Sequence, residues 1–325
     1  MRRADCSPTR SEMAPLAAIL LALASLAAAA PSLSVRQAIT SLSSAQISTF
    51  TPYSFYAAAG YCSPASTLAW NCGTNCVGAN PNFHPIASGG DGDDVQFWFV
   101  GVDETLGTVI VSHQGTDPTQ ILSLVTDSDF FLGTLDPTLF PGVSSSVEVH
   151  SGFRDEQAKT ATDVLTAVQT ALSQFGIKKV TITGHSLGGA IALIDSVYLP
   201  LHITGVTFQT IVYGLPRVGN QAFANLASVG NTVTHINNKE DPVPILPGSF
   251  SASRMSLSDL IFQSGMFLGF HHPTGEIHIE DSGAWDACPG QDNESDLCST
   301  GDVPTIFSGD TSDHDGPYNG VEMEC

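Results

Sequence analysis

The sequence predicts an α/β protein in which helices cover both faces of a central, mostly parallel sheet. The first observation is that segments with strand and helix patterns alternate along the chain. The second is the composition: hydrophobic residues make up 42% of the 325 residues and charged residues only 13%, which suits a large core and not a disordered chain. The third is that no internal repeat or long linker interrupts the pattern after Ala30, so we expect a single domain over residues 30–325.

The predicted elements follow in the order that such a sheet requires. Residues 95–102 and 108–113 have the pattern of consecutive strands joined by a turn. An amphipathic helix is predicted over 153–175, where Val164 and Val168 repeat at helical spacing. The later elements are a buried strand at 179–183, a helix at 187–198, and strands at 209–213 and 232–237.

The N-terminal segment differs in composition from the rest of the chain. Residues 13–30 are an apolar stretch that follows three arginines and ends in alanines. The alanines at 27–29 supply an A-x-A cleavage pattern, so we predict a signal peptide over 1–29 and a secreted, extracellular chain that starts at Ala30. Met13 begins a conventional signal by itself and is the alternative translation start. A membrane anchor is disfavoured because the apolar run is short for a span and rich in alanine.

Charge narrows the possible partners. The formal net charge is −21, from 11 Lys and Arg against 32 Asp and Glu. So acidic a surface repels phosphate backbones, which argues against nucleic acids as partners. It also argues against docking to a membrane through a polybasic segment. The acidic runs at 91–94 and 310–315 lack the spacing of an EF-hand loop and are predicted to be solvated turns. We expect a monomer that needs no metal or other cofactor.

Cysteine usage agrees with an oxidising, extracellular environment. Cys6 lies in the leader, and an even number of cysteines remains after it. Spacing and elimination predict the pairs Cys62–Cys325, Cys72–Cys76 and Cys288–Cys298. A zinc site is the alternative, but no histidine lies at ligand spacing near these cysteines. Asn293 begins a glycosylation sequon inside the last of these loops, where a surface position is expected.

Residues 184–188 match the pattern G-x-S-x-G and lie between a predicted buried strand and a predicted helix. In this context the sharp turn forces Ser186 into a strained conformation that exposes its Oγ, and glycines at 184 and 188 let the strand and helix approach closely. The helix N-terminus also favours a developing negative charge. A chance match in an ordinary turn is the alternative, but the context favours a nucleophile and an α/β-hydrolase fold.

A nucleophilic serine needs a base and an orienting carboxylate, which in this fold follow the serine in the order acid, then histidine. The loop after the strand at 232–237 offers Glu240 and Asp241, of which Glu240 suits a solvated turn better. Four histidines follow this loop, and chain order alone does not choose among them: His271, His272, His278 and His314.

Five segments together resemble the class 3 lipase family, the secreted α/β-hydrolase lipases typical of filamentous fungi. In family order they are GHSLGGA at 184–190, YGLPRVGN at 213–220, NKEDPVPILP at 238–247, FHHPTGEIHI at 270–279 and DHDGPYNGV at 313–321. The resemblance implies Asp241 as the acid and His314 as the base, and it gives the other three histidines a structural role. The family's disulfide between the N-terminal and C-terminal parts also resembles the predicted Cys62–Cys325 pair.

The resemblance extends to the oxyanion hole, which needs two N–H donors. One is the backbone of Leu187, the residue after the nucleophile. The other is implied at Thr116, in the loop HQGTD at 113–117. Family members often carry arginine where this chain has Gln114, so the anchoring of the loop is left open. A plain turn is the alternative interpretation of this segment.

An apolar stripe follows the oxyanion loop within residues 118–131. It consists of Ile121, Leu122, Leu124 and Val125. Such a stripe is usually core, but here it resembles the hinged lid of the family, and an apolar lid suits lipid aggregates. Residues 248–263 belong to a connection longer than the family's usual one, and they are interpreted as either an inserted apolar loop or a retained intron.

These features predict a secreted triacylglycerol lipase that acts on lipid esters at an oil–water interface through a Ser–His–Asp triad and an acyl-enzyme. A feruloyl-type or other soluble-ester esterase of the same family is the first alternative. A catalytically inactive binding protein on this scaffold is the second, and it is disfavoured because all three triad candidates are present.

Overall fold

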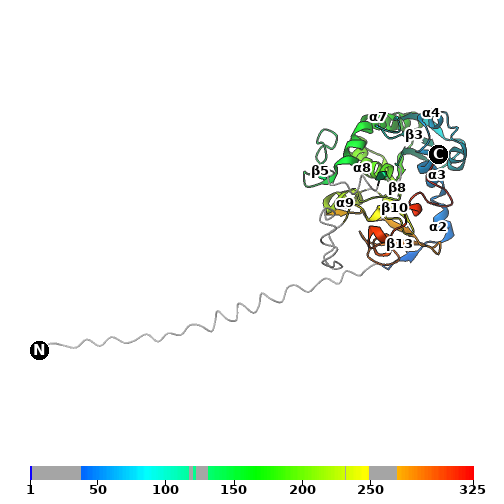
Figure 1. The fold of residues 1–325 in the computed structure, drawn as a ribbon. Coiled ribbons are helices and arrows are strands. Elements are labelled where there is room, and N and C mark those ends of the chain that lie inside the picture. The colour runs from blue at the N-terminus through cyan, green and yellow to red at the C-terminus, as the bar shows by residue number, and fades with distance from the viewer. Residues whose placement is uncertain (2–37, 117–119, 122–130, 231, 249–268) are drawn as a thin grey trace. The chain divides into compact units, whose positions relative to one another are not determined.

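A mixed sheet forms the centre of the compact unit Gln37–Cys325 in the computed structural model (Figure 1). The structure describes Met1 and residues 38–116, 120–121, 131–230, 232–248 and 269–325. Several predictions fall outside these residues: the signal peptide beyond Met1, the lid residues Leu122, Leu124 and Val125, and the stretch 249–263.

The central sheet has nine strands over the described residues. From edge to edge they are β1 (Thr40–Ser41), β13 (Trp285–Cys288), β12 (Glu276–Ile279), β10 (Thr232–Asn238), β8 (Thr207–Tyr213), β7 (Lys179–His185), β4 (Thr108–His113), β3 (Trp98–Asp103) and β2 (His84–Gly89). The central strands, from β12 to β4, pair in parallel, and the strands at both edges pair antiparallel. The predicted α/β fold is confirmed. The short β3–β4 connection explains one antiparallel edge, since a parallel pair needs a long crossover.

A second sheet was not predicted. Its strands, in the order β11–β9–β6–β5, are Phe270–His271, Gly219–Asn220, Glu148–His150 and Leu132–Thr134, and all pairs are antiparallel. Strands of two or three residues contain too few positions for an alternating pattern, so periodicity could not reveal them.

Helices supply the crossovers between the parallel strands. The described helices are α2 (Ser44–Ser48), α3 (Thr51–Ala59), α4 (Pro64–Leu68), α5 (Gly73–Ala79), α7 (Ser151–Phe175), α8 (Leu187–His202), α9 (Gln221–Ser228) and α11 (Ser299–Asp302), with 3-10 turns η1 (Val243–Ile245), η2 (Ile306–Ser308) and η3 (Thr311–Asp313). The predicted helices at 153–175 and 187–198 correspond to α7 and α8, although α8 continues to His202 with Pro200 inside its last turn. The helix α7 ends where Gly176 adopts a left-handed conformation, with φ 68°.

The core lies on both faces of the sheet, because successive side chains of a strand point to opposite sides. In β4, Val109 and Val111 belong to the core that α7 and α8 cover, whereas Ile110 belongs to the core that α3 covers. The helix α8 is buried continuously from Leu187 to Leu199. Its apolar sequence therefore fits its position, since a helix that is hydrophobic on all sides belongs in the interior.

Three disulfides join the cysteine pairs predicted from the sequence: Cys62–Cys325, Cys72–Cys76 and Cys288–Cys298. The first links residues that are 263 positions apart, so it ties the N-terminal helices to the C-terminal segment. Asn293 lies in the loop closed by the third disulfide. It is half-buried, and its Nδ2 donates a hydrogen bond to the carbonyl of Pro289.

Removing the long-range disulfide should lower stability more than removing the short-range one. The double substitution Cys62→Ala and Cys325→Ala should lower the free energy of unfolding by ~2–4 kcal/mol, because the unfolded chain gains the freedom of a very long loop. Cys72→Ala with Cys76→Ala is the matched control, since it opens a loop of only 4 positions. Urea unfolding followed by fluorescence measures both, and equal losses would contradict the loop-closure argument.

Candidate active site

The turn between β7 and α8 holds Ser186 in the conformation predicted from its motif. Ser186 has φ 57° and ψ −124°, a backbone conformation that residues other than glycine rarely adopt. A Cβ at Gly184 would lie 2.4 Å from the carbonyl oxygen of Gly188, and one at Gly188 would lie 2.2 Å from the carbonyl oxygen of His113. Glycine at both positions therefore allows the contact of strand and helix that places Ser186 at the turn.

The structure brings Asp241 and His314 into direct contact. Asp241 follows β10, His314 follows η3, and His314 Nδ1 donates to Asp241 Oδ2 at 2.8 Å. The other carboxylate oxygen accepts the backbone N–H of Val243 at 2.9 Å. Both side chains are almost completely buried. The aspartate is thus oriented by its own loop, and it fixes the imidazole with Nε2 available for another partner.

Gly214 lets the ring of His314 lie against the chain at the end of β8. Gly214 follows β8 with φ 51°, and a Cβ there would lie 2.9 Å from Cε1 of His314. The backbone N–H of Ser186 donates to the carbonyl of Tyr213 at 3.0 Å, so the serine and the histidine flank the same point of the chain. Ser186 Oγ and His314 Nε2 are buried atoms with no hydrogen-bond partner among the described residues.

The other candidates for base occupy different surroundings. His271 Nδ1 lies 3.1 Å from Asp292, and His272 Nε2 donates to the carbonyl of Pro244 at 2.7 Å. His278 is buried in β12 with Nε2 3.0 Å from the carbonyl oxygen of Lys239. Each ring has a contact within the scaffold, as expected for structural residues.

Glu240, the competing acid, is partly exposed, and burial raises the pKa of its carboxyl group. Its backbone carbonyl accepts the N–H of Asp310 at 2.8 Å. It therefore connects the acid loop to the loop of the base through the main chain, while the neighbouring Asp241 makes the contact with His314.

The predicted oxyanion loop is anchored by the residue that departs from the family pattern. The backbone N–H of Gln114 donates to the carbonyl of Phe97, and the N–H of Phe97 donates to Gln114 Oε1, both at 2.8 Å. Gln114 therefore extends the β3–β4 pairing beyond the end of β4. A Cβ at Gly188 would also lie 2.7 Å from the carbonyl of Gln114, so this loop lies against the first turn of α8, which begins at Leu187.

Thr116 and Ile121 are the other described residues of this region. The Thr116 hydroxyl donates to the side chain of Gln120 at 3.2 Å. Ile121 is completely buried and belongs to the same core as Leu187. It is the described member of the predicted lid stripe.

A hydrogen-bonded chain that the sequence did not reveal links three of the loops. His185 Nε2 lies 2.8 Å from the carbonyl of His314, so Nε2 must donate, and Nδ1 accepts from the Tyr61 hydroxyl at 2.6 Å. The backbone of Gly115 in turn hydrogen-bonds to Tyr61. Burial and the neighbouring His314 hold the pKa of His185 well below its ordinary value, so the ring stays neutral. His185 occupies the unspecified position x of the nucleophile motif, which gave no hint of this role.

The loop that carries His314 is held by the end of β10. Asn238 Nδ2 donates to the carbonyls of Asp313 and Gly316, at 2.9 and 3.0 Å. Lys239 Nζ forms an ion pair with Asp313 at 3.1 Å. These contacts span more than seventy positions of sequence, so they could not be read from local pattern.

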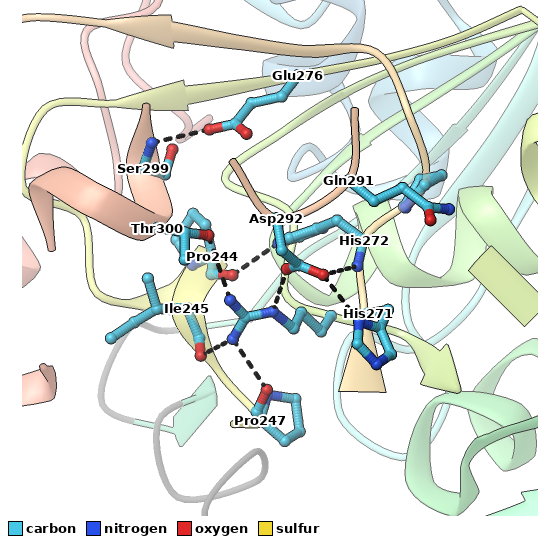
Figure 2. A network of polar contacts seen from close by, with 12 residues as sticks. Pro244, Ile245, Pro247, His271, His272, Glu276, Gln291, Asp292, Ser299 and Thr300 are labelled. Atoms are coloured by element: carbon cyan, nitrogen blue, oxygen red, sulfur yellow. Dashed lines mark hydrogen bonds and ion pairs between the residues drawn. The ribbon is translucent and has the colours of Figure 1, made fainter. Parts of the chain in front are cut away.

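Arg217 is hydrogen-bonded to the loop that follows Asp241, and Figure 2 labels its partners Ile245, Pro247 and Asp292. The side chain is 2% exposed, and it donates to the carbonyls of Ile245 and Pro247 just after Asp241 in the chain. Its Nε donates to Asp292 at 2.6 Å. Although burial opposes it, the charge of Arg217 holds the pKa of Asp292 far below its ordinary value. The motif YGLPRVGN could have pointed to the arginine, but nothing in the sequence pointed to its partner.

A stacked histidine pair beside this network makes stability depend on pH. His235 and His272 stack with ring centroids 4.8 Å apart, and burial lowers the pKa of each to about 4. In the unfolded chain each should titrate near its ordinary value of about 6.5. The unfolded state then binds more protons between these values, so the free energy of unfolding falls as pH falls from about 6.5 to about 4.

Each histidine adds at most about 1.4 kcal/mol per pH unit to that slope. Urea unfolding at several values between about pH 7 and about pH 4 measures it. His272→Gln should flatten the slope, because one of the histidines that contribute to it is removed. A slope unchanged by this substitution would contradict the assignment of buried neutral rings.

A pocket of about 590 Å³ opens beside the oxyanion loop. Tyr61 and Thr116 line it, whereas Ser186 does not, so among the described residues it adjoins the predicted oxyanion loop and not the nucleophile. Its remaining wall includes four acidic residues: Asp93, Asp315, Glu322 and Glu324. An anionic group would be repelled in this pocket.

A strained serine on an α/β sheet, next to a buried aspartate–histidine pair, is the arrangement of the serine hydrolases with the α/β-hydrolase fold, and this chain is one of them. Residues 110–251 match the family model described as Lipase (class 3). Over these residues the chain is similar to the class 3 lipase family, and both its relatives and its structural neighbours carry lipase names.

Among the relatives, a secreted mono- and diacylglycerol lipase of Malassezia globosa is 28% identical over 245 residues, or 73% of either chain. One from Malassezia restricta is 30% identical over 215 residues, which are 65% of this chain and 64% of the relative. The triacylglyceride lipase of Rhizomucor miehei superposes with a TM-score of 0.68 at 26% identity, over 88% of this chain and 98% of that one. Lipase II from Rhizopus niveus gives 0.70 at 25% identity, over 89% and 100%.

Proposed function

We propose that this chain is a secreted hydrolase of acylglycerol esters that uses Ser186 as nucleophile, His314 as base and Asp241 as the orienting acid. The observation that carries the proposal is the Asp241–His314 contact beside Ser186. Ser186 Oγ and His314 Nε2 are buried without partners among the described residues, whereas buried polar atoms are normally hydrogen-bonded. A nucleophile and base kept ready for a substrate account for this exception.

The chemistry follows from this geometry. Ser186 Oγ attacks the ester carbonyl while His314 Nε2 takes its proton, and Asp241 stabilises the imidazolium that forms. The tetrahedral intermediate collapses, His314 returns the proton to the leaving alcohol, and an acyl-enzyme remains. Water, activated by His314 in the same way, then attacks the acyl group and releases the fatty acid.

The oxyanion of each tetrahedral intermediate needs two N–H donors. The backbone of Leu187 supplies one, because it is the first residue of α8 and its N–H has no partner within the helix. The backbone of Thr116 supplies the other from the loop anchored by Gln114. The positive end of the α8 dipole adds to the stabilisation of the negative charge.

Two observations and one prediction from the sequence support acylglycerols as the substrates. Relatives are named mono- and diacylglycerol lipases, and structural neighbours are named triacylglycerol lipases. The acidic pocket beside Thr116 suits a neutral ester better than an anionic lipid. The predicted apolar lid suits an oil–water interface, and Ile121 is its described residue.

Export and assembly complete the proposal. Residues 1–29 act as a signal peptide, Asn293 carries a glycan, and the chain works as a monomer at the lipid surface without binding nucleic acid. Relatives named as secreted and the three disulfides support export. The triad candidates all lie within one chain, so catalysis needs no second copy. Within the described ranges, no helix combines the length and apolar character needed to cross a membrane.

Substitution of the triad should separate the catalytic histidine from the structural ones. Ser186→Ala and His314→Ala should each lower kcat on p-nitrophenyl butyrate by about 10³-fold or more, because members of a triad act as a unit. His271→Ala is the matched control and should retain most of the activity. Circular dichroism checks the fold of each variant. Residual activity of Ser186→Ala within tenfold of the parent would overturn the assignment of the nucleophile.

The substrate class is tested by comparing emulsified triolein with dissolved methyl ferulate. We expect fatty-acid release from triolein, with a rise in rate once a short-chain triglyceride passes its solubility limit, and little release of ferulate. Ser186→Ala provides the blank for both substrates. Preferential hydrolysis of methyl ferulate would instead identify a feruloyl-type esterase.

A further inference from the structure

A buried polar trio lies beneath the active site and takes no part in the mechanism above. His113 ends β4, Gln157 lies in α7 and Asp195 lies in α8. His113 Nε2 donates to Asp195 Oδ2, and Gln157 Nε2 donates to Asp195 Oδ1, both at 2.8 Å. The three side chains are at most 1% exposed and are surrounded by the core between the sheet and the two helices.

Burial of this kind needs an explanation, because a buried ion pair contributes little to stability. The desolvation of the charges offsets their attraction, and apolar residues of similar volume often stabilise a protein as well or better. Gln157 also leaves its own Oε1 buried without a partner in the described part of the chain, while its Nε2 serves Asp195. The hydrogen bonds from His113 and Gln157 therefore hold the Asp195 carboxylate in one orientation. These contacts fix the geometry of the trio rather than add stability.

The position of the trio shows what this geometry controls. His113 is followed directly by Gln114, which begins the oxyanion loop and is held by Phe97. Asp195 lies seven residues, about two helical turns, beyond Gly188, on the face of α8 that touches β4. The two proposed oxyanion donors come from different elements, one from the loop after β4 and one from the start of α8. Apolar packing alone permits small sliding between a strand and a helix, whereas hydrogen bonds are directional.

We infer that His113, Asp195 and Gln157 form a positioning network that fixes the end of β4 against α8, and thereby sets the distance between the N–H groups of Thr116 and Leu187. The inference rests on the proposed esterase chemistry, since it concerns the oxyanion hole of that reaction. None of the three residues touches the substrate. Loss of the network should weaken binding of the transition state and leave binding of the ground state unchanged.

The test replaces the trio with apolar residues of similar size: His113→Phe, Gln157→Leu and Asp195→Leu together. No buried donor or charge is left unpaired, so the variant should unfold at a urea concentration close to that of the parent. On dissolved p-nitrophenyl butyrate we expect kcat to fall about tenfold or more with KM within about twofold, because a displacement of reacting groups by about 1 Å can cost as much as a hundredfold.

Three companion variants sharpen the result. Asp195→Asn keeps both hydrogen bonds if the amide of Gln157 turns over, so its kcat should stay within about threefold of the parent. Gln157→Leu keeps the hydrogen bond between His113 and Asp195 and should lower kcat about threefold, which provides the test if the triple variant fails to fold. Thr108→Val with Thr181→Val removes a buried 2.9 Å hydrogen bond at the far end of β4 and should leave kcat unchanged.

The inhibition constant of butylboronic acid is a quantity that would not change if the trio had only a structural role. Its tetrahedral adduct with Ser186 presents an oxyanion, so its Ki should rise in step with the loss of kcat in the triple variant and in Gln157→Leu. A folded triple variant, or Gln157→Leu, with kcat and Ki within twofold of the parent would overturn the inference. A parent chain that does not hydrolyse the ester would overturn the proposed function itself.

Discussion

The left-handed backbone of Ser186 is the constraint on which the neighbouring structure depends. With φ 57° this conformation costs about 1–3 kcal/mol, and it persists only where the surroundings determine it. Here β7 is hydrogen-bonded on both sides, to β4 and β8, and α8 is buried over most of its length. A side chain at Gly184 or Gly188 would push the strand and helix apart and relax the turn.

The loops around that turn share one physical problem. Beyond the last ladder pair of a strand, the backbone loses its neighbour, yet buried N–H and C=O groups still require partners. In this chain, single side chains take the place of the missing strand, because each one hydrogen-bonds to backbone groups of a loop. Gln114 bonds to Phe97 at the oxyanion loop, Asn238 bonds to two carbonyls of the base loop, and Arg217 bonds to two carbonyls of the acid loop. Each loop is thus fixed near the proposed site by side-chain contacts to its backbone.

Much of the fold and of the candidate site could be predicted, because the signals were local. The strands at 108–113 and 232–237, the helix at 153–175 and the turn at Ser186 rest on short windows of sequence, and the structure places them with shifts of a few residues at most. The choice of Asp241 over Glu240 needed the resemblance to a family, since both are carboxylates on one loop.

The features that could not be predicted are contacts between residues that are distant in sequence. Arg217 and Asp292 are 75 positions apart, and His113 and Asp195 are 82 apart. A periodic pattern records which face of an element is apolar, and it carries no information about which polar residue of another element lies opposite. Tyr61 and His185 were missed for the same reason, although His185 stands inside the motif that identified the nucleophile.

Two of the buried polar pairs adjoin loops of the proposed site. Arg217, which pairs with Asp292, donates to carbonyls of the loop that follows Asp241, and His113, which pairs with Asp195, directly precedes the loop that contains Thr116. Neither pair is an efficient source of stability, since desolvation offsets most of its attraction. The apolar cores on the two faces of the sheet supply stability instead, but they do not resist small displacements in a particular direction. Acyl transfer needs donors and base placed to within a fraction of an ångström, and under the proposed function both pairs adjoin loops that carry such groups.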